Sequence, residues 1–435
     1  MNLTPEQMAI GRRNFLKAIA GVPAVAALGT AAAIRGPARG GAVRVGFVGV
    51  GGQGRALLGR LDPVFADVRA MADINPVSLQ RADDVLKKNK RPAAKHYVEW
   101  RDMLQHEDLE GVIVAVPLWA HADVVCGALD AGKHVLCEKM MAWDTAGYTR
   151  MIETARKNTR ILEIGYQRNY NPVYRSAYEG VMRQGLLGDV HYVRLAWHRN
   201  GNWRRTGDPP SKDFDASKWG YPTWDHLWNW RLYWKYSQGL FAELGSHQVN
   251  AVNWFLGATP QHVQATGGIH RYNDGREVPD HVYAIFDYPG GVTGSFTSVE
   301  SNAFDERYEA FYGTKGTLII RNENDAMLFD EGAGAKATGV EVAPKGAGAL
   351  LDASETKPAN AGGTARPAAT ETPAKPNQPS PSTIEIARFC SAVRVGTPLL
   401  CGPENATHSA AWCIAANEAL KSGAKVTIDP GFKTT

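Results

Sequence analysis

Cysteine is scarce in this 435-residue chain, which has five and no Cys-x-x-Cys pair. The absence of that spacing argues against a disulfide framework and against a zinc site, so we expect no bound metal. Three of the five lie in apolar runs, and free cysteines are common in protein interiors. We therefore expect buried core cysteines at these positions: Cys126, Cys137, Cys390, Cys401 and Cys413.

The chain also lacks a large excess of charge of one sign. Its formal net charge is +4, and residues 1–33 hold +2 of it, because Arg12, Arg13 and Lys17 outnumber Glu6 there. The remaining sequence shows no basic stripe. We expect no nucleic-acid partner, since such a partner calls for Lys and Arg clustered on one face.

A long apolar run is missing as well. The mildly apolar stretch Ala18 to Ala33 has 16 residues, fewer than the roughly 20 that a membrane helix needs, so no stable span is expected. It follows Arg12-Arg13-Asn14-Phe15-Leu16-Lys17 and ends in Ala31-x-Ala33, which resembles a twin-arginine export signal with its cleavage site. We expect residues 1–40 to be signal and spacer, and the twin-arginine machinery to export the folded protein to the periplasm. The alternative is an amphiphilic helix with a chance arginine pair.

Three glycines form a recognisable motif near the start of the chain. The apolar run from Val43 ends in Gly49-x-Gly51-x-x-Gly54, and a helix-like segment follows. Strand, tight turn and helix form a dinucleotide-binding unit, in which the diphosphate sits on the helix N-terminus. A glycine turn without a ligand is the alternative. We expect cofactor contacts from these turn residues: Gly49, Gly51, Gly52, Gln53, Gly54 and Arg55.

An acidic residue ends the second strand-like run. Asp73 lies 19 residues after Gly54, where a carboxylate holds the adenosine ribose hydroxyls. It would repel the extra phosphate of NADP, so we favour NAD. Nearby Arg55 and Arg69 keep NADP open.

The chain divides by its hydrophobic periodicity. Strand-like and helix-like runs alternate over 41–165, which predicts an α/β doubly wound parallel sheet, the Rossmann domain. Period-two runs over 166–331 predict an α+β domain with an open, mostly antiparallel sheet. Helices would cover one face, and the other would be a partner surface, so we expect a homo-oligomer. Residues 332–382 are predicted to be a flexible low-complexity insertion, and 383–435 two helices that return to the body.

Two short motifs place chemistry near the expected cofactor. Glu138 and Lys139 end the fifth strand-like run, and open α/β sheets bind ligands beyond the carboxyl ends of their strands. Gly239-x-x-x-Glu243-x-x-x-His247 lies in a helical segment, where Glu243 and His247 share a face.

Together these motifs resemble the Gfo/Idh/MocA oxidoreductase family. The resemblance rests on the glycine turn, Pro117-x-x-x-His121, AGKHVLCEK, the stretch GYQRNYNPVYR at 165–175 and the Glu243/His247 helix. It covers about residues 43–330 and the last two helices. Two residues depart from the family pattern: Met140 replaces the usual proline, and Glu243 the more common aspartate.

The resemblance implies an NAD(P)-dependent oxidoreductase that acts on a carbinol of a sugar, glycoside or cyclitol. His247 would be the base, Lys139 would orient the hydroxyl and stabilise alkoxide charge, and Glu243 would bind a neighbouring hydroxyl or hold the imidazole. The further cofactor contacts would be Pro117, His121, Glu138 and Lys139. The substrate contacts would be Lys139, Arg168, Asn171, Trp203, Glu243 and His247.

Tryptophan is concentrated in one stretch. Seven of the twelve fall between Trp197 and Trp234, interleaved with arginines and other polar residues. Flat apolar faces beside hydrogen-bonding groups suit a carbohydrate. An interface, or a surface loop that packs on itself, would use the same composition.

Two other functions remain open. A glycosidase or lyase of the same superfamily would oxidise the sugar only transiently, although such glycosidases usually lack the Lys139 equivalent. A non-catalytic nucleotide- or sugar-binding protein would need neither Lys139 nor His247. We expect the cofactor to be bound tightly, because free NAD is scarce outside the cytoplasm and a folded protein can be exported with nucleotide in place.

Overall fold

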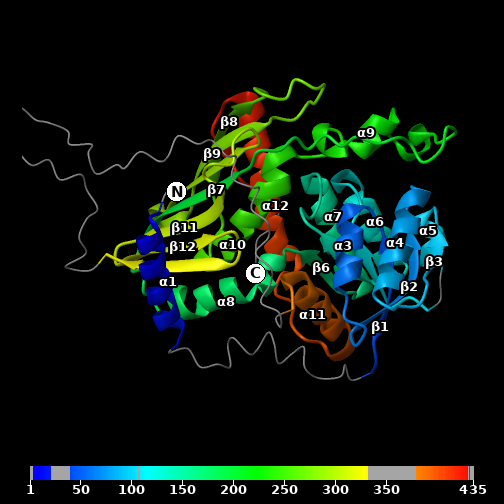
Figure 1. The fold of residues 1–435 in the computed structure, drawn as a ribbon, viewed down its shortest axis with the longest axis horizontal. Coiled ribbons are helices and arrows are strands. Elements are labelled where there is room, and N and C mark those ends of the chain that lie inside the picture. The colour runs from blue at the N-terminus through cyan, green and yellow to red at the C-terminus, as the bar shows by residue number, and fades with distance from the viewer. Residues whose placement is uncertain (1–2, 21–39, 106–107, 332–378, 430, 432–435) are drawn as a thin grey trace, which may run out of the picture.

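The computed structural model describes residues 3–20, 40–105, 108–331, 379–429 and 431. Its first sheet has six parallel strands in the order β3-β2-β1-β4-β5-β6 (Figure 1). The strands are β1 (Val43–Val48), β2 (Ala66–Ala72), β3 (Lys95–Tyr97), β4 (Gly111–Val114), β5 (His134–Glu138) and β6 (Leu162–Gly165). The strand order reverses between β1 and β4, and ligands of such sheets bind at that switch point. The predicted doubly wound sheet is confirmed.

Helices cover both faces of this sheet. They are α3 (Gly52–Arg60), α4 (Pro76–Lys88), α5 (Trp100–Leu104), α6 (His121–Asp130) and α7 (Thr145–Asn158). Helices α3 and α4 share one apolar cluster with α11 (Pro381–Val395), which comes from the C-terminal part of the chain. Helices α5, α6 and α7 bury their apolar residues in the other cluster.

The second sheet has eight strands in the order β13-β12-β11-β7-β10-β9-β8-β14. All neighbours are antiparallel except β7 and β10, so the mostly antiparallel sheet is confirmed. Strands β13 and β14 were not anticipated. The strands are β7 (Val190–His198), β8 (His262–Gly268), β9 (His281–Asp287), β10 (Thr293–Val299), β11 (Arg307–Gly313), β12 (Gly316–Arg321), β13 (Asp325–Asp330) and β14 (Val426–Thr427).

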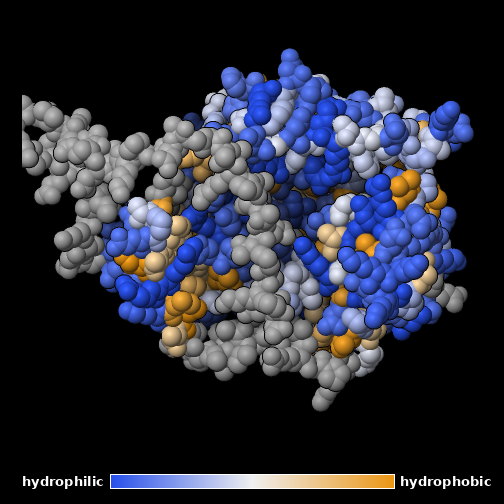
Figure 2. All heavy atoms as spheres, in the orientation of Figure 1, coloured by the Kyte–Doolittle hydropathy of each residue, from blue (hydrophilic) through white to orange (hydrophobic). Residues whose placement is uncertain are grey.

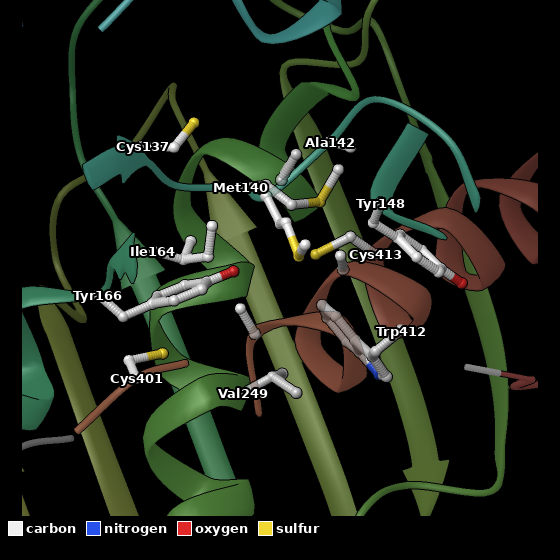
Figure 3. Packing of buried hydrophobic residues seen from close by; sticks show 14 of the residues in the cluster. Cys137, Met140, Ala142, Tyr148, Ile164, Tyr166, Val249, Cys401, Trp412 and Cys413 are labelled. Atoms are coloured by element: carbon white, nitrogen blue, oxygen red, sulfur yellow. The ribbon is translucent and has the colours of Figure 1, made fainter. Parts of the chain in front are cut away.

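Helices pack on one face of the second sheet and join it to the first. They include α8 (Pro172–Ala177), α10 (Ser246–Leu256) and α12 (Pro403–Ser422). The short helices are η1 (Leu118–Ala120), η2 (Gln167–Tyr170), η3 (Tyr178–Met182), η4 (Ala216–Trp219), α9 (Trp224–Trp228), η5 (Trp230–Leu232), η6 (Phe241–Gly245) and η7 (Pro289–Gly291). Between the two sheets, Met140, Tyr166, Val249, Trp412 and Cys413 meet in one core (Figure 3). All five cysteines are buried and free, as predicted.

The outer face of the second sheet carries the N-terminal helix α1 (Pro5–Ala20), drawn in blue in Figure 1. The guanidinium of Arg12 donates two hydrogen bonds of 2.6 Å to Asp325, at the start of β13. Gly11 lies so close to β13 that a Cβ there would be 2.6 Å from the ring of Phe329. Phe15 is buried, whereas Arg13 and Leu16 are exposed. Hydrophobic residues remain visible at the C-terminal end of the helix (Figure 2).

Helix α1 covers only one end of that face. Its apolar side packs on a cluster from β7, β11, β12 and β13. Farther along, on β9, Ile285 keeps 61% and Tyr283 40% of its surface exposed. The expected cleavage site at Ala31 and Ala33 and most of the expected insertion at 332–382 lie outside the described residues. Within the described part, no helix is long and apolar enough to cross a membrane.

Candidate functional site

The glycine turn after β1 has the space that a diphosphate needs. Gly49 has a φ of +85°, and a Cβ there would be 2.6 Å from the carbonyl oxygen of Ala115. A Cβ on Gly54 would be 2.1 Å from the carbonyl oxygen of Gly49, so helix and strand pack without side chains between them. Gly51 and Gly52, in contrast, face open space within 4 Å. Backbone fills one side of the turn, and the other is open.

The open side is also electropositive. Helix α3 begins at Gly52, and its N-cap residue Gly51 contributes no side-chain hydrogen bond. The amides of the first turn are therefore available to an anion, and the helix dipole favours one. Gln53 and Glu138 tie this turn to the end of β5 by a hydrogen bond of 2.6 Å. These features fit the pyrophosphate of a dinucleotide.

Asp73 lies just beyond β2, beside the glycine turn. Its carboxylate accepts 2.8 Å hydrogen bonds from the amides of Val50 and Asn75. Two carboxylate oxygens have about four acceptor sites, so the ribose hydroxyls of NAD can still be bound. Burial raises the pKa of Asp73 to about 6, although the amides of Asn75 and Val50 and the charge of Arg55 oppose the rise.

This pKa predicts a pH dependence of NAD binding. Ribose hydroxyls donate to the ionised form of Asp73, so binding should weaken as the carboxyl is protonated when the pH falls through about 6. We expect the Kd for NAD to rise about tenfold between pH 7 and pH 5. Titration calorimetry at several pH values would measure it. Asp73→Asn cannot ionise, and its weaker binding should lose this tenfold change; an unchanged pH profile in the variant would rule out Asp73 as the titrating group.

Lys139 and Glu243 meet across the two domains. Lys139 directly follows β5, and its ammonium donates to the backbone oxygen of Glu243 at 3.0 Å. It lies 4.0 Å from the Glu243 carboxylate, which also accepts a 2.9 Å hydrogen bond from Nε of Arg231. Burial acts to raise the pKa of Glu243, but Arg231 and Lys139 outweigh it and hold the pKa below its usual value. The site thus has a fixed carboxylate between two cations.

His247 lies on α10, which continues from the π-helical turn η6 that holds Glu243. Such widened turns are frequent at functional sites. The imidazole lies between Trp197 and Tyr166, and its buried Nδ1 has no hydrogen-bond partner in the part of the chain that the structure describes. Burial and the charge of Lys139 keep the pKa of His247 well below 6.5, so the ring is neutral at pH 7. An unpartnered buried nitrogen costs about 1–3 kcal/mol, which a substrate hydroxyl would relieve.

His121, predicted to contact the cofactor, has both ring nitrogens beside backbone oxygens of its own domain. Its two ring nitrogens lie 2.9 and 3.0 Å from the backbone oxygens of Met140 and Val116, and the residue is buried. It therefore supports the segment that carries Lys139. Pro117 precedes η1 in the same supporting loop. Met140 points into the core shown in Figure 3, which accounts for an apolar side chain after Lys139.

Arg168 and Asn171, the predicted substrate contacts from the stretch at 165–175, have hydrogen-bond partners within the protein. The guanidinium of Arg168 is buried and donates to Glu309 and Glu323 through all three nitrogens. Asn171 caps α8 through the amide of Val173 and donates to the backbone of Glu323. Both residues therefore support the fold, and a contact of either one with substrate stays a prediction.

Residues 199–236, which hold six of the seven tryptophans of the tryptophan-rich stretch, form a cover over the carboxyl edge of the parallel sheet. In Figure 1 the cover is the segment that carries α9. Most of its rings pack on one another, as Trp224 does on Trp228 and Phe214. Trp203 has the guanidinium of Arg199 at 4.0 Å from its ring, so one of its faces is taken. A loop packing on itself thus explains most of the tryptophans better than a sugar platform does.

The cover is joined to the first domain by a hydrogen bond, the latch, that the sequence did not indicate. Nε1 of Trp119, in η1, donates a 2.7 Å hydrogen bond to the hydroxyl of Tyr221. Burial raises the pKa of Tyr221, and Asp73 is close enough to add to the rise. Nε1 of Trp143 donates to the backbone oxygen of Trp234. The cover therefore extends from the neighbourhood of Asp73 to that of Glu243.

Comparison with known proteins agrees with this geometry. Residues 43–166 match the family described as "Oxidoreductase family, NAD-binding Rossmann fold", and residues 177–319 match the "GFO/IDH/MocA C-terminal domain". The chain is 24% identical to myo-inositol 2-dehydrogenase of Thermotoga maritima over 66% of this chain and 79% of that protein. It is 31% identical to a glycosyl hydrolase family 109 protein of Shewanella baltica, over 37% and 39% respectively, so it spans well under half of that relative.

Solved structures share the fold. The WlbA dehydrogenase from Chromobacterium violaceum, in complex with NADH and UDP-GlcNAcA, has a TM-score of 0.66 and 18% identity over 91% of this chain and 99% of that one. Levoglucosan dehydrogenase in complex with NADH has a TM-score of 0.65 and 17% identity, over 89% and 99%. With both domains matched in order and a cleft suited to the dinucleotide, the chain belongs to the Gfo/Idh/MocA oxidoreductases and carries an NAD-binding Rossmann domain.

Proposed function

We propose that this protein is an exported NAD-dependent dehydrogenase that oxidises or reduces a carbinol of a sugar, glycoside or cyclitol. The observation that carries the proposal is the meeting of Lys139, Glu243 and neutral His247 beside the dinucleotide cleft. The inositol and levoglucosan dehydrogenases among its relatives support a polyhydroxylated substrate.

The three side chains divide the chemistry. NAD, when bound, supplies the hydride acceptor. His247 is neutral at pH 7 and takes the proton of the reacting hydroxyl, as a general base must. The Lys139 ammonium stabilises the negative charge that develops on that oxygen. Glu243, fixed by Arg231, accepts a hydrogen bond from a neighbouring hydroxyl.

The proposal is tested by incubating the purified protein with a panel of glycosides and cyclitols. Absorbance of the reduced nicotinamide and the appearance of a ketosugar would support it. Neither signal with any member of the panel, in protein shown to hold NAD, would contradict it.

A glycosidase acting through a transient ketosugar is the second candidate, favoured by the glycosyl hydrolase family 109 relatives. It would release the aglycone without net change of the nicotinamide. A chromogenic aryl glycoside with parallel absorbance at the nicotinamide band separates the two reactions in one assay.

The arginine pair at 12–13 suggests export with the cofactor in place, and the cover suggests how the cofactor is retained. We expect the purified protein, when denatured, to release close to one nicotinamide nucleotide per chain, mostly NAD. Chromatography of the released nucleotide against standards measures this. Protein that is isolated empty and needs millimolar NAD in the assay would contradict retention, although not the dehydrogenase activity.

The latch offers a matched test of that retention. Tyr221→Phe keeps the ring and loses only the hydrogen bond to Trp119. It should release NAD faster than the wild type in a chase with excess nucleotide. Tyr192→Phe removes a hydroxyl bonded to Ser295 on the second sheet and serves as the control.

We also propose that Tyr283 and Ile285 on the outer sheet face belong to a homo-oligomer interface.

A further inference from the structure

The arginines of the cover differ in one respect: three of the four are paired with carboxylates. Arg199 pairs with Glu300, Arg204 with Asp225 and Asp274, and Arg231 with Glu243. Arg205 has no ion pair or side-chain hydrogen bond among the described residues. Its one recorded side-chain contact is the ring of Trp228, at the 6.0 Å limit of a cation–π contact.

The backbone of Arg205 is nevertheless fixed. Asn229 is buried, accepts a 2.6 Å hydrogen bond from the Arg205 amide and donates one of 3.1 Å to its carbonyl. Asn229 lies two residues before Arg231, whose Nε holds the Glu243 carboxylate. A buried amide two positions before Arg231 thus fixes the backbone of Arg205, a residue exposed to solvent.

The charges around Arg205 favour an anion. Partial burial lowers the pKa of Arg205, and the nearby cations Arg231 and Arg55 lower it further. Glu243 opposes them, but its carboxylate is already bound by Arg231 and lies beside Lys139. The two cations that act on Arg205 outnumber the one carboxylate that does so, Glu243, and an arginine fork suits a carboxylate.

We propose that Arg205 binds the carboxylate of an acidic sugar, so that the preferred substrate is a uronate or another sugar acid. This inference rests on the proposed dehydrogenase activity. Among the described residues Arg231 bonds Glu243 through Nε, which leaves its two outer nitrogens for the same anion. The phosphates of a bound dinucleotide would be the other source of an anion, because Arg55 of the glycine turn is one of the cations that act on Arg205.

The experiment compares a methyl glucuronide-type glycoside with the matching neutral methyl glucoside, using wild type, Arg205→Gln and Arg205→Lys. We expect Arg205→Gln to lower kcat/KM for the acidic sugar by about 10- to 100-fold, the usual size of a lost charge-assisted hydrogen bond. The neutral sugar should change less than threefold, and Arg205→Lys should recover part of the loss. Arg183→Gln, on an exposed arginine far from the cleft, is the control.

Three results would overturn this assignment. The first is a wild type that prefers the neutral sugar, and the second is an equal effect of Arg205→Gln on kcat/KM for both sugars. The third is weaker NAD binding in Arg205→Gln with unchanged kcat/KM for both sugars, which would assign Arg205 to the cofactor phosphates. Tryptophan fluorescence of the NAD-loaded protein, titrated with the acidic sugar, gives a readout that needs no turnover. Binding that depends on Arg205 without oxidation would contradict the dehydrogenase proposal alone.

Discussion

Replacing Lys139 with alanine is expected to lower turnover by about 100-fold or more, the scale of a lost charge-stabilising group. The ammonium donates to the backbone oxygen of Glu243 and lies at the carboxyl end of β5, where we propose that the reacting oxygen gains negative charge. Steady-state kinetics with the best substrate of the glycoside panel would measure the loss.

Binding of NAD should survive this substitution, because the glycine turn and Asp73 are unchanged. Lys157→Ala, on the exposed surface of α7, removes a similar charge without reaching the site and serves as the control. Near-normal turnover in Lys139→Ala would remove Lys139 from the mechanism. Partial recovery on addition of methylamine would show that the missing group is the amine itself.

Replacing His247 with alanine should have an effect of similar size, about 100-fold or more on kcat, because the hydroxyl proton loses its acceptor. His262→Gln removes a half-exposed imidazole on β8 and should leave turnover unchanged. Bound NAD per chain, measured on the same preparations, distinguishes lost chemistry from lost folding. Full activity of His247→Ala would assign the proton to another group.

The pH profile adds a direction to this prediction. Burial and Lys139 lower the pKa of His247, so the ring stays neutral, and able to accept a proton, below the pH at which an ordinary histidine becomes charged. Oxidation should therefore persist below pH 6.5 and be lost as the pH falls through the lowered pKa. Removing the Lys139 charge should raise that pKa and move the acid limb upward. Proton NMR of the His247 ring in Lys139→Met would follow the shift independently of turnover.

The sequence carried the elements whose signal is local. Alternating runs located β1 to β12, and the spacing of Gly49, Gly54 and Asp73 predicts the dinucleotide site, because each depends on residues close in the chain. Strand β13 escaped notice since its apolar core, Ala326 to Phe329, is only four residues long and is bounded by aspartates.

Contacts between distant segments were beyond such reasoning. Nothing in the periodicity joins Trp119 to Tyr221, 102 residues apart, or Arg12 to Asp325. Arg168 shows the same limit: a polar motif shared with a family suggests ligand contact, whereas its buried pairing with Glu309, 141 residues away, could not be predicted from neighbouring residues.

Because α1 is docked on β13, Asp325 and any receptor for the arginine pair compete for the same guanidinium. One guanidinium cannot be bound by Asp325 and by a receptor at the same time, so any receptor for the Arg12-Arg13 pair binds only the fraction of chains whose helix has left the sheet. Its apparent dissociation constant is the intrinsic one divided by that fraction. Each 1.4 kcal/mol of docking free energy, as a rough rule, thus weakens recognition about tenfold. A second copy of the chain that used the same end of the sheet would shift the balance the other way, by freeing the helix it displaces.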